Sequence, residues 1–109
     1  MEAKLVGSEV EVKYLEPATN SDGSSLTDLE STSIFTQVQG SDPSKVVDVA
    51  ATSSRGGGNI TQIITVPINE NAEVNVDIWA TAKDTTGNES VPSQKITIRI
   101  DRLSPSAPL

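Results

Sequence analysis

Residues 74–82, with the sequence VNVDIWATA, decide the fold class of this chain. Every second position is apolar, and polar or aromatic residues stand between them. A period of two is typical of a β-strand with one face against a core, because successive side chains of a strand point to opposite faces. The stretch therefore predicts a strand that turns Val76 and Ile78 inward and Trp79 outward.

The same alternation recurs on both sides of this stretch. We expect further strands at residues 10–15, 32–38, 45–52, 60–68 and 95–101, and a short first strand within residues 3–7. Turn-forming residues separate them at 20–23, 42–44, 69–72 and 84–88. No long segment has a helical period of 3.6 residues, so the pattern predicts an all-β fold, a two-sheet antiparallel β-sandwich of about seven strands. Its expected core is Val10, Val12, Tyr14, Ile34, Ile64, Val66, Val76, Ile78, Ala80, Ile96 and Ile98.

Length and composition limit the chemistry that the chain can perform. Its 109 residues fit one domain, which we expect at residues 1–103, with a Pro/Ser-rich tail or linker at 104–109. Cysteine and histidine are absent, which removes the thiol nucleophile, the thiolate zinc site and the usual general base near neutral pH. We therefore expect no enzymatic activity: no catalytic residues, no cofactor and no metal site.

The net charge of −7 limits the kinds of partner that the chain can bind. An acidic surface repels phosphate groups, so we expect neither nucleic-acid binding nor docking to anionic lipid. No apolar run approaches the length of a membrane span, and the first residues show no signal peptide.

Trp79 and Phe35 are the candidate partner-binding residues. If Ile34 and Ile78 face the core, Phe35 and Trp79 project to the outside of their strands. One interpretation is an interface hot spot for a protein or a sugar ring. The alternative is that Trp79 lies flat on its own sheet and is shielded by the stems of Lys or Arg.

Two further clusters have an ordinary explanation. Asp22, Asp28 and Asp84 fall in expected loops, but no run of alternating carboxylates supplies the six or so oxygen ligands that calcium needs. Turn capping by the side chains explains these residues better. Residues 55–58, RGGG, lack the Lys and Ser/Thr of a phosphate-binding loop, so we interpret them as a mobile loop.

Three stretches resemble fibronectin type III domains of the variety found in bacterial and phage proteins. Residues 10–17, VEVKYLEP, are similar to that family's second strand, with Tyr14 in the place of its tryptophan. Residues 20–29 resemble its Asp-Gly-x-x-Leu-x-Asp-Leu loop, and residues 82–90 its Gly-Asn-Glu-Ser loop. The family's tyrosine in the penultimate strand is replaced by Val76, and the first strand is curtailed, which leaves an edge open to pairing with a partner strand. The resemblance implies an immunoglobulin-like scaffold for adhesion, spacing or recognition. It also implies that the strands of Phe35 and Trp79 are neighbours in one sheet, so that the two side chains lie side by side on its outside.

From these features we expect a non-enzymatic structural or interaction module, specifically an accessory or decoration protein of a phage virion or similar assembly that acts by protein–protein contact. Two alternatives stay open. One is a carbohydrate- or cell-surface-binding module of a larger secreted bacterial protein, and the other is an inert spacer. The expected location is the virion, the extracellular space or the cell surface, and self-association into a homo-oligomer is also open.

Overall fold

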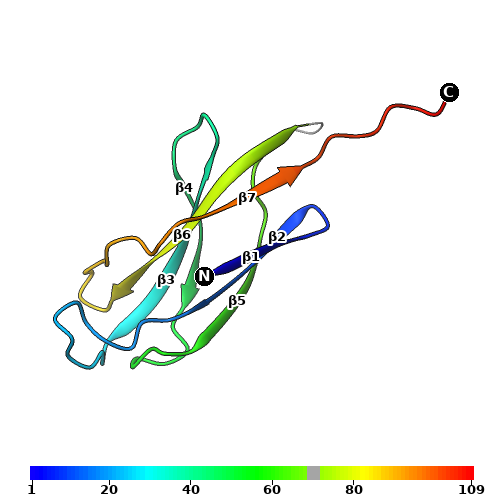
Figure 1. The fold of residues 1–109 in the computed structure, drawn as a ribbon. Helices are drawn as coiled ribbons and strands as arrows, with labels where there is room; N and C mark the ends of the chain where they lie inside the picture. The colour runs from blue at the N-terminus through cyan, green and yellow to red at the C-terminus, as the bar shows by residue number, and fades with distance from the viewer. Residues whose placement is uncertain (69–71) are drawn as a thin grey trace.

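The computed structural model describes residues 1–68 and 72–109, and in this part of the chain seven strands form two sheets that pack face to face (Figure 1). The strands are β1 (Glu2–Val6), β2 (Glu9–Leu15), β3 (Leu29–Val38), β4 (Ser44–Ala50), β5 (Asn59–Ile64), β6 (Glu73–Asp84) and β7 (Ile96–Asp101). The sheet orders are β1-β2-β5 and β4-β3-β6-β7, and all pairings are antiparallel. The predicted all-β, immunoglobulin-like β-sandwich is confirmed.

β6 has the phase that its alternation predicts. Val76 and Ile78 are fully buried between the sheets, while Trp79 lies on the opposite face of the strand. β6 is a central strand that pairs with β3 and with β7, so its ladder is satisfied on both sides. The same phase places Asp77, Trp79 and Thr81 on the outer face of the four-stranded sheet.

The hydrophobic core differs from the expected one at its ends. Its centre is Val10, Val12, Ile34, Ile64, Val66, Val76, Ile78 and Ile100. Tyr14, Ile96 and Ile98 are only half-buried. β7 is an edge strand and leaves two of its isoleucines partly open, while the Tyr14 hydroxyl lies 2.6 Å from Thr32 Oγ1. Partial burial raises the pKa of Tyr14 above its ordinary value.

Two strands begin or end at other residues than expected, because loop hydrogen bonds replace the pairing between strands there. β3 begins at Leu29, three residues before the expected start, and β5 ends at Ile64 rather than at Ile68. Pro67 has no N–H to donate, and the Ile68 N–H bonds instead to the carbonyl of Val66 in a tight turn. The turn expected at 69–72 falls largely on residues 69–71, which lie outside the described part of the chain.

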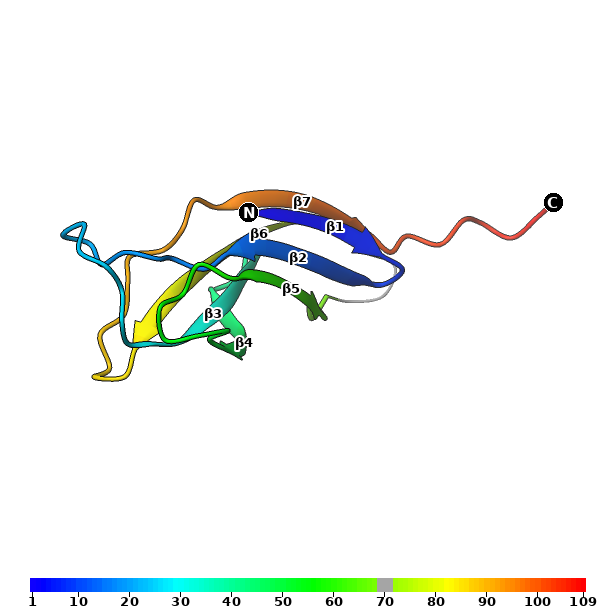
Figure 2. The ribbon, with the colours of Figure 1, turned by 90° about the horizontal axis from the view of Figure 1, so that it is seen from below.

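The first strand is more complete than expected. β1 pairs with β2 over its whole length, from Glu2 opposite Lys13 to Val6 opposite Glu9. It also lies alongside β7 of the other sheet, as Figure 2 shows. In the described residues β2 is the only ladder partner of β1, which is therefore an edge strand, and the expectation that this edge is open to a partner strand stays a prediction.

The loop at residues 55–58 is held in place rather than free. The buried carboxylate of Glu16, which is 2% exposed, accepts bonds from Gly58 N–H at 3.0 Å and from Thr52 N–H at 2.9 Å, with a third from the Thr52 hydroxyl. Gly57 N–H donates to the carbonyl of Pro17, and Gly56 has a positive φ of 66°. The interpretation as a mobile loop is wrong, because the three glycines let the backbone approach Glu16 and Pro17 closely.

Candidate functional site

Phe35 and Trp79 lie side by side on the outer face of the four-stranded sheet, as predicted. They are directly opposite one another in the β3–β6 ladder. Their ring centroids are 5.8 Å apart and their planes differ by 5°, which is a stacked pair. Such a pair contributes about 0.5–1.5 kcal/mol beyond the area it buries.

Trp79 is nevertheless shielded, with only 6% of its surface exposed. Phe35 covers one side of the indole, and the Lys95 ammonium lies over the ring at 4.5 Å from its centroid. Lys95 is carried there by the segment before β7, because Ser93 N–H donates to the Ala80 carbonyl and Ser93 Oγ accepts from Ala80 N–H. Of the two alternatives for Trp79, the structure shows the covered one. Phe35 is half-buried and is the accessible member of the pair.

Lys95 is a member of this site that the sequence reasoning did not name. The signal was present, because Ile96 faces the core and its neighbour must therefore face outward, on the side of Trp79. A Lys at the turn into the neighbouring strand is the residue type that covers an outward indole through its stem and a cation–π contact.

Polar hollows flank the aromatic pair on two sides. One, of about 420 Å³, is lined chiefly by Gln37, Gln39, Asn75, Asp77 and Thr97. The other, of about 390 Å³, is lined by residues that include Ser31, Ser33, Lys45, Asp48 and Lys83. The outer face of the four-stranded sheet thus has an aromatic centre and a polar rim.

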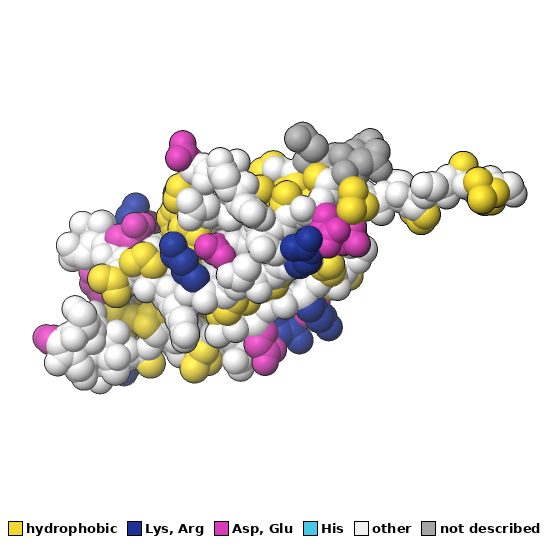
Figure 3. Space-filling model, turned by 45° about the horizontal axis from the view of Figure 1, so that its top comes forward, with side chains coloured by type: hydrophobic (Ala, Val, Ile, Leu, Met, Phe, Trp, Pro, Cys, Tyr) yellow, Lys and Arg dark blue, Asp and Glu magenta, His cyan; other side chains and the backbone are white. Residues whose placement is uncertain are grey.

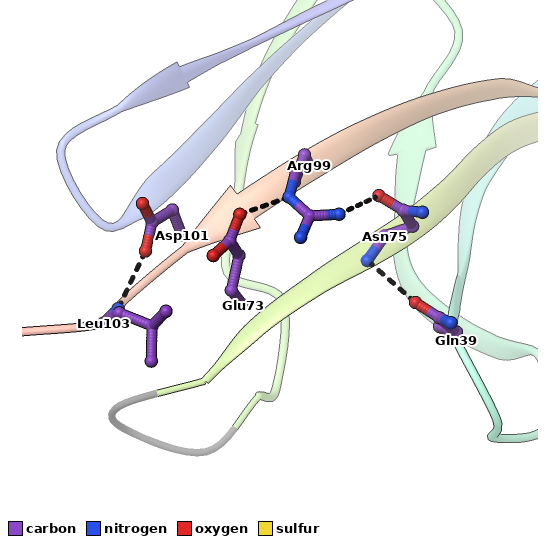
Figure 4. A network of polar contacts seen from close by, with 6 residues as sticks. All are labelled: Gln39, Glu73, Asn75, Arg99, Asp101 and Leu103. Atoms are coloured by element: carbon purple, nitrogen blue, oxygen red, sulfur yellow. Dashed lines mark hydrogen bonds and ion pairs between the residues drawn. The ribbon is translucent and has the colours of Figure 1, made fainter.

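Hydrogen bonds fix the side chains of this rim. Beside the first hollow, Arg99 forms an ion pair with Glu73 and donates to Asn75 Oδ1 at 3.3 Å, and Gln39 accepts from Asn75 N–H (Figure 4). Thr97 Oγ1 donates to Asp77 at 2.6 Å.

Asp48 is fixed in the same way beside the second hollow. It accepts from the Ser33 hydroxyl at 2.5 Å and pairs with Lys45 at 3.3 Å. The Ser33 hydroxyl, and then Lys45, lower the pKa of Asp48. Hydrogen bonds and ion pairs within the protein therefore hold the side chains of the rim.

Two of the three loop carboxylates, those of Asp22 and Asp84, cap turns, as interpreted from the sequence, whereas Asp28 contributes its backbone carbonyl, which accepts from Thr85 N–H. Asp22 accepts from the N–H and hydroxyl of Ser24, which lower its pKa, and Asp84 accepts from Thr86 and Asn88. Among residues 1–68 and 72–109 there is no group of three or more Asp or Glu arranged to hold a metal ion.

An apolar hollow at one end of the sandwich was not predicted. It has a volume of about 600 Å³ and lies between the segment after β2 and the loop after β6. Leu26 and Leu29 are buried beneath it, while Val91 at its border is 84% exposed. The only sequence signal was two leucines in a polar loop, which a search for strand periodicity does not detect.

The surface carries charges of both signs between apolar side chains, as Figure 3 shows for one face. No helix in the described residues has the length and hydrophobicity to span a membrane. No family model matches the chain, and neither does any curated protein or solved structure. Function must therefore be argued from the surfaces of the sandwich.

Proposed function

We propose that this chain is a non-enzymatic structural and interaction module of the fibronectin type III kind, which serves as an accessory or decoration protein of a phage particle or similar assembly. The observation that carries the proposal is Phe35, held half-exposed on the covered indole of Trp79 at the centre of a polar rim. The partner in this proposal is a protein.

The geometry supports protein contact for two reasons. Interfaces concentrate their binding free energy in a few central aromatic or Arg residues that a rim shields from water. Phe35 is also held by stacking, and Asp48 and Asp77 by hydroxyl donors, before any partner arrives. Side chains that are already ordered lose little conformational entropy on binding.

A carbohydrate ligand is the alternative that the hollow beside Phe35 favours, because Gln37, Asn75 and Asp77 offer amide and carboxylate groups to sugar hydroxyls. It would require stacking on Phe35, since Trp79 is covered. In the third alternative, an inert spacer, the same covering of Trp79 serves only solubility, and nothing binds the outer face of the four-stranded sheet.

The test uses particles purified by density gradient from the organism that encodes the chain. We expect the added chain to cosediment with them and the Phe35→Ala variant to remain in the supernatant. The matched control is Leu15→Ala, which removes an apolar side chain that is 65% exposed on the three-stranded sheet, and it should still cosediment. Circular dichroism checks that both variants fold.

Two outcomes would overturn the proposal in favour of a named alternative. Binding to a glycan array that Phe35→Ala abolishes, without particle binding, would indicate the carbohydrate module. No binding to either, in a folded chain, would leave the spacer.

A further inference from the structure

The edge strands of the two sheets differ in how well they are protected from pairing with other chains. An exposed edge presents unpaired N–H and C=O groups, and proteins blunt such edges with charges, bulges or covering elements. β4 carries Lys45 and Asp48 and has a bulge in its pairing with β3. β7 carries Arg99 and Asp101. β1 carries Glu2 and Lys4 and lies alongside β7.

β5 is the unprotected edge in the described part of the chain. Its sequence, NITQII, contains no charged residue and no proline, and β2 is its only neighbour in the sheet. Three of its six residues are isoleucine and one is threonine, which are strong strand formers. Ile63 is 41% exposed on the outer face of its sheet. This composition is typical of a strand that adds to another strand.

We propose that a second copy of this chain pairs with this edge, β5 against β5 in antiparallel orientation. A two-fold axis near Gln62 places Thr61 opposite Ile63 of the second copy, and Ile60 opposite its Ile64. Both are pairs of β-branched residues, which stabilise antiparallel ladders. The sheet β1-β2-β5 then continues directly into the same sheet of the second copy.

The chemistry of β5 argues for a second copy over a foreign strand. A two-fold contact requires a self-complementary surface, and an uncharged strand opposes no like charges to itself. The chain as a whole carries −7, yet none of that charge lies on β5. Pairing of two such strands therefore desolvates no charged group.

The dimer is weak and depends on salt. Six residues from each copy bury less surface than the total of about 1,000 Å² that a stable interface needs. The two acidic sandwiches also repel each other, and this repulsion is screened as the ionic strength rises. Association therefore increases with both protein concentration and salt.

Sedimentation equilibrium of the full chain tests the proposal. We expect the average mass to rise from 11.5 kDa with concentration, and to rise further in about 500 mM NaCl than in about 20 mM NaCl. Ile63→Lys should abolish the rise, because it places a charge in the new interface, while Glu11 opposite it in β2 keeps the sandwich intact. The control Val6→Lys adds the same charge opposite Glu9 at a residue that is 46% exposed, and should associate as the original chain does.

A cross-link tests the register directly, because the chain has no cysteine of its own. Opposed residues in an antiparallel ladder have Cα atoms about 4.5–5.5 Å apart, which a disulfide spans. Mild oxidation of Gln62→Cys should yield a covalent dimer, whereas Thr97→Cys on β7 should not. A chain that stays monomeric at every concentration and salt, equal association of Ile63→Lys and Val6→Lys, or equal cross-linking of the two cysteine variants would overturn the proposal. Occupation of the edge by a strand of another protein would do the same.

Discussion

Asp84 organises the loop after β6 through four hydrogen bonds. Its Oδ1 accepts from Thr86 N–H, the Thr86 hydroxyl and Asn88 N–H, and its Oδ2 accepts from the Asn88 amide. All of these donors favour the carboxylate, and the Thr86 hydroxyl is the largest contributor to the lowered pKa of Asp84. The stabilisation is therefore complete above the ordinary aspartate pKa of about 4 and is lost as the pH falls through the lower folded value.

We predict that Thr86→Val returns the pKa of Asp84 toward its ordinary range. The variant should melt at a lower temperature than the original chain near neutral pH, and the difference should shrink at acid pH, where Asp84 is protonated in both. NMR titration of the carboxyl carbon and thermal unfolding across pH measure the two effects. Thr85→Val, which removes a hydroxyl without a bond to Asp84, should leave the titration unchanged. An unaltered pKa in Thr86→Val would refute the assignment.

The role of an individual residue was predictable from the sequence only where its neighbours in the chain determine that role. The aspartates next to Gly, Ser and Thr indicated turn capping by their chemistry alone. Alternation along β2 places Glu16 on the inner face with Val12 and Tyr14. The donors that satisfy its carboxylate there, Thr52 and Gly58, were not predictable, because they lie 36 and 42 residues away in sequence. The accessibility of Trp79 depended in the same way on Lys95, which reaches the indole from the segment before β7.

The connection between β4 and β5 depends on a close backbone approach at Gly56. A Cβ placed on Gly56 would lie 1.9 Å from the Pro17 carbonyl oxygen, and the residue has a φ of +66°. Gly87 has a similarly unfavourable φ of +92° but open space around it. The two glycines therefore separate the effect of backbone conformation from that of steric overlap.

We predict that Gly87→Ala lowers the free energy of unfolding by about 1 kcal/mol, from the left-handed backbone alone. Gly56→Ala should lower the free energy of unfolding by a further ~1–3 kcal/mol, because the methyl group forces the backbone away from Pro17. Urea unfolding measures both values. Equal losses of unfolding free energy in the two variants would mean that the loop can relax away from Pro17, which would contradict the close approach at Gly56.

Strand existence and phase were predictable, whereas strand ends and edges were not. Alternation identified the strands and the outward direction of Phe35 and Trp79, because a period of two survives in every strand with one buried face, while the family resemblance indicated that the two residues are neighbours. The start of β3 at Leu29 and the end of β5 at Ile64 depend on loop hydrogen bonds that leave no periodic signal. The protection of an edge depends on sheet order, which the sequence alone did not give.

At the scale of the molecule, Arg102 joins three segments at the base of the tail. Its guanidinium donates to the carbonyls of Ser8 and Ile68, and its N–H donates to that of Ala72. Beyond it, residues 105–109 extend away from the sandwich and are exposed. The expected division of the chain at residue 103 stays a prediction, and Arg102 provides a way to test it.

We predict that removing residues 105–109 leaves the melting temperature unchanged, since these residues bury nothing against the sandwich. Arg102→Ala should lower the free energy of unfolding by about 1–2 kcal/mol, because the carbonyls of Ser8 and Ile68 lose their donors. Thermal and urea unfolding of the two variants provide the comparison. A destabilised truncation beside an unaffected Arg102→Ala would place the boundary further along the chain.

The alignment of β1 with β7 has a mechanical consequence. The two strands run side by side in the same direction, one at the start of the chain and one leading into the tail (Figures 1 and 2). Tension between the two ends therefore acts along the strands and loads the β1–β2 and β6–β7 ladders in shear. Hydrogen bonds loaded in shear share the force and break together, whereas those pulled open from one end break in succession. A sandwich held by its two ends would resist stretching up to a high force and then yield abruptly.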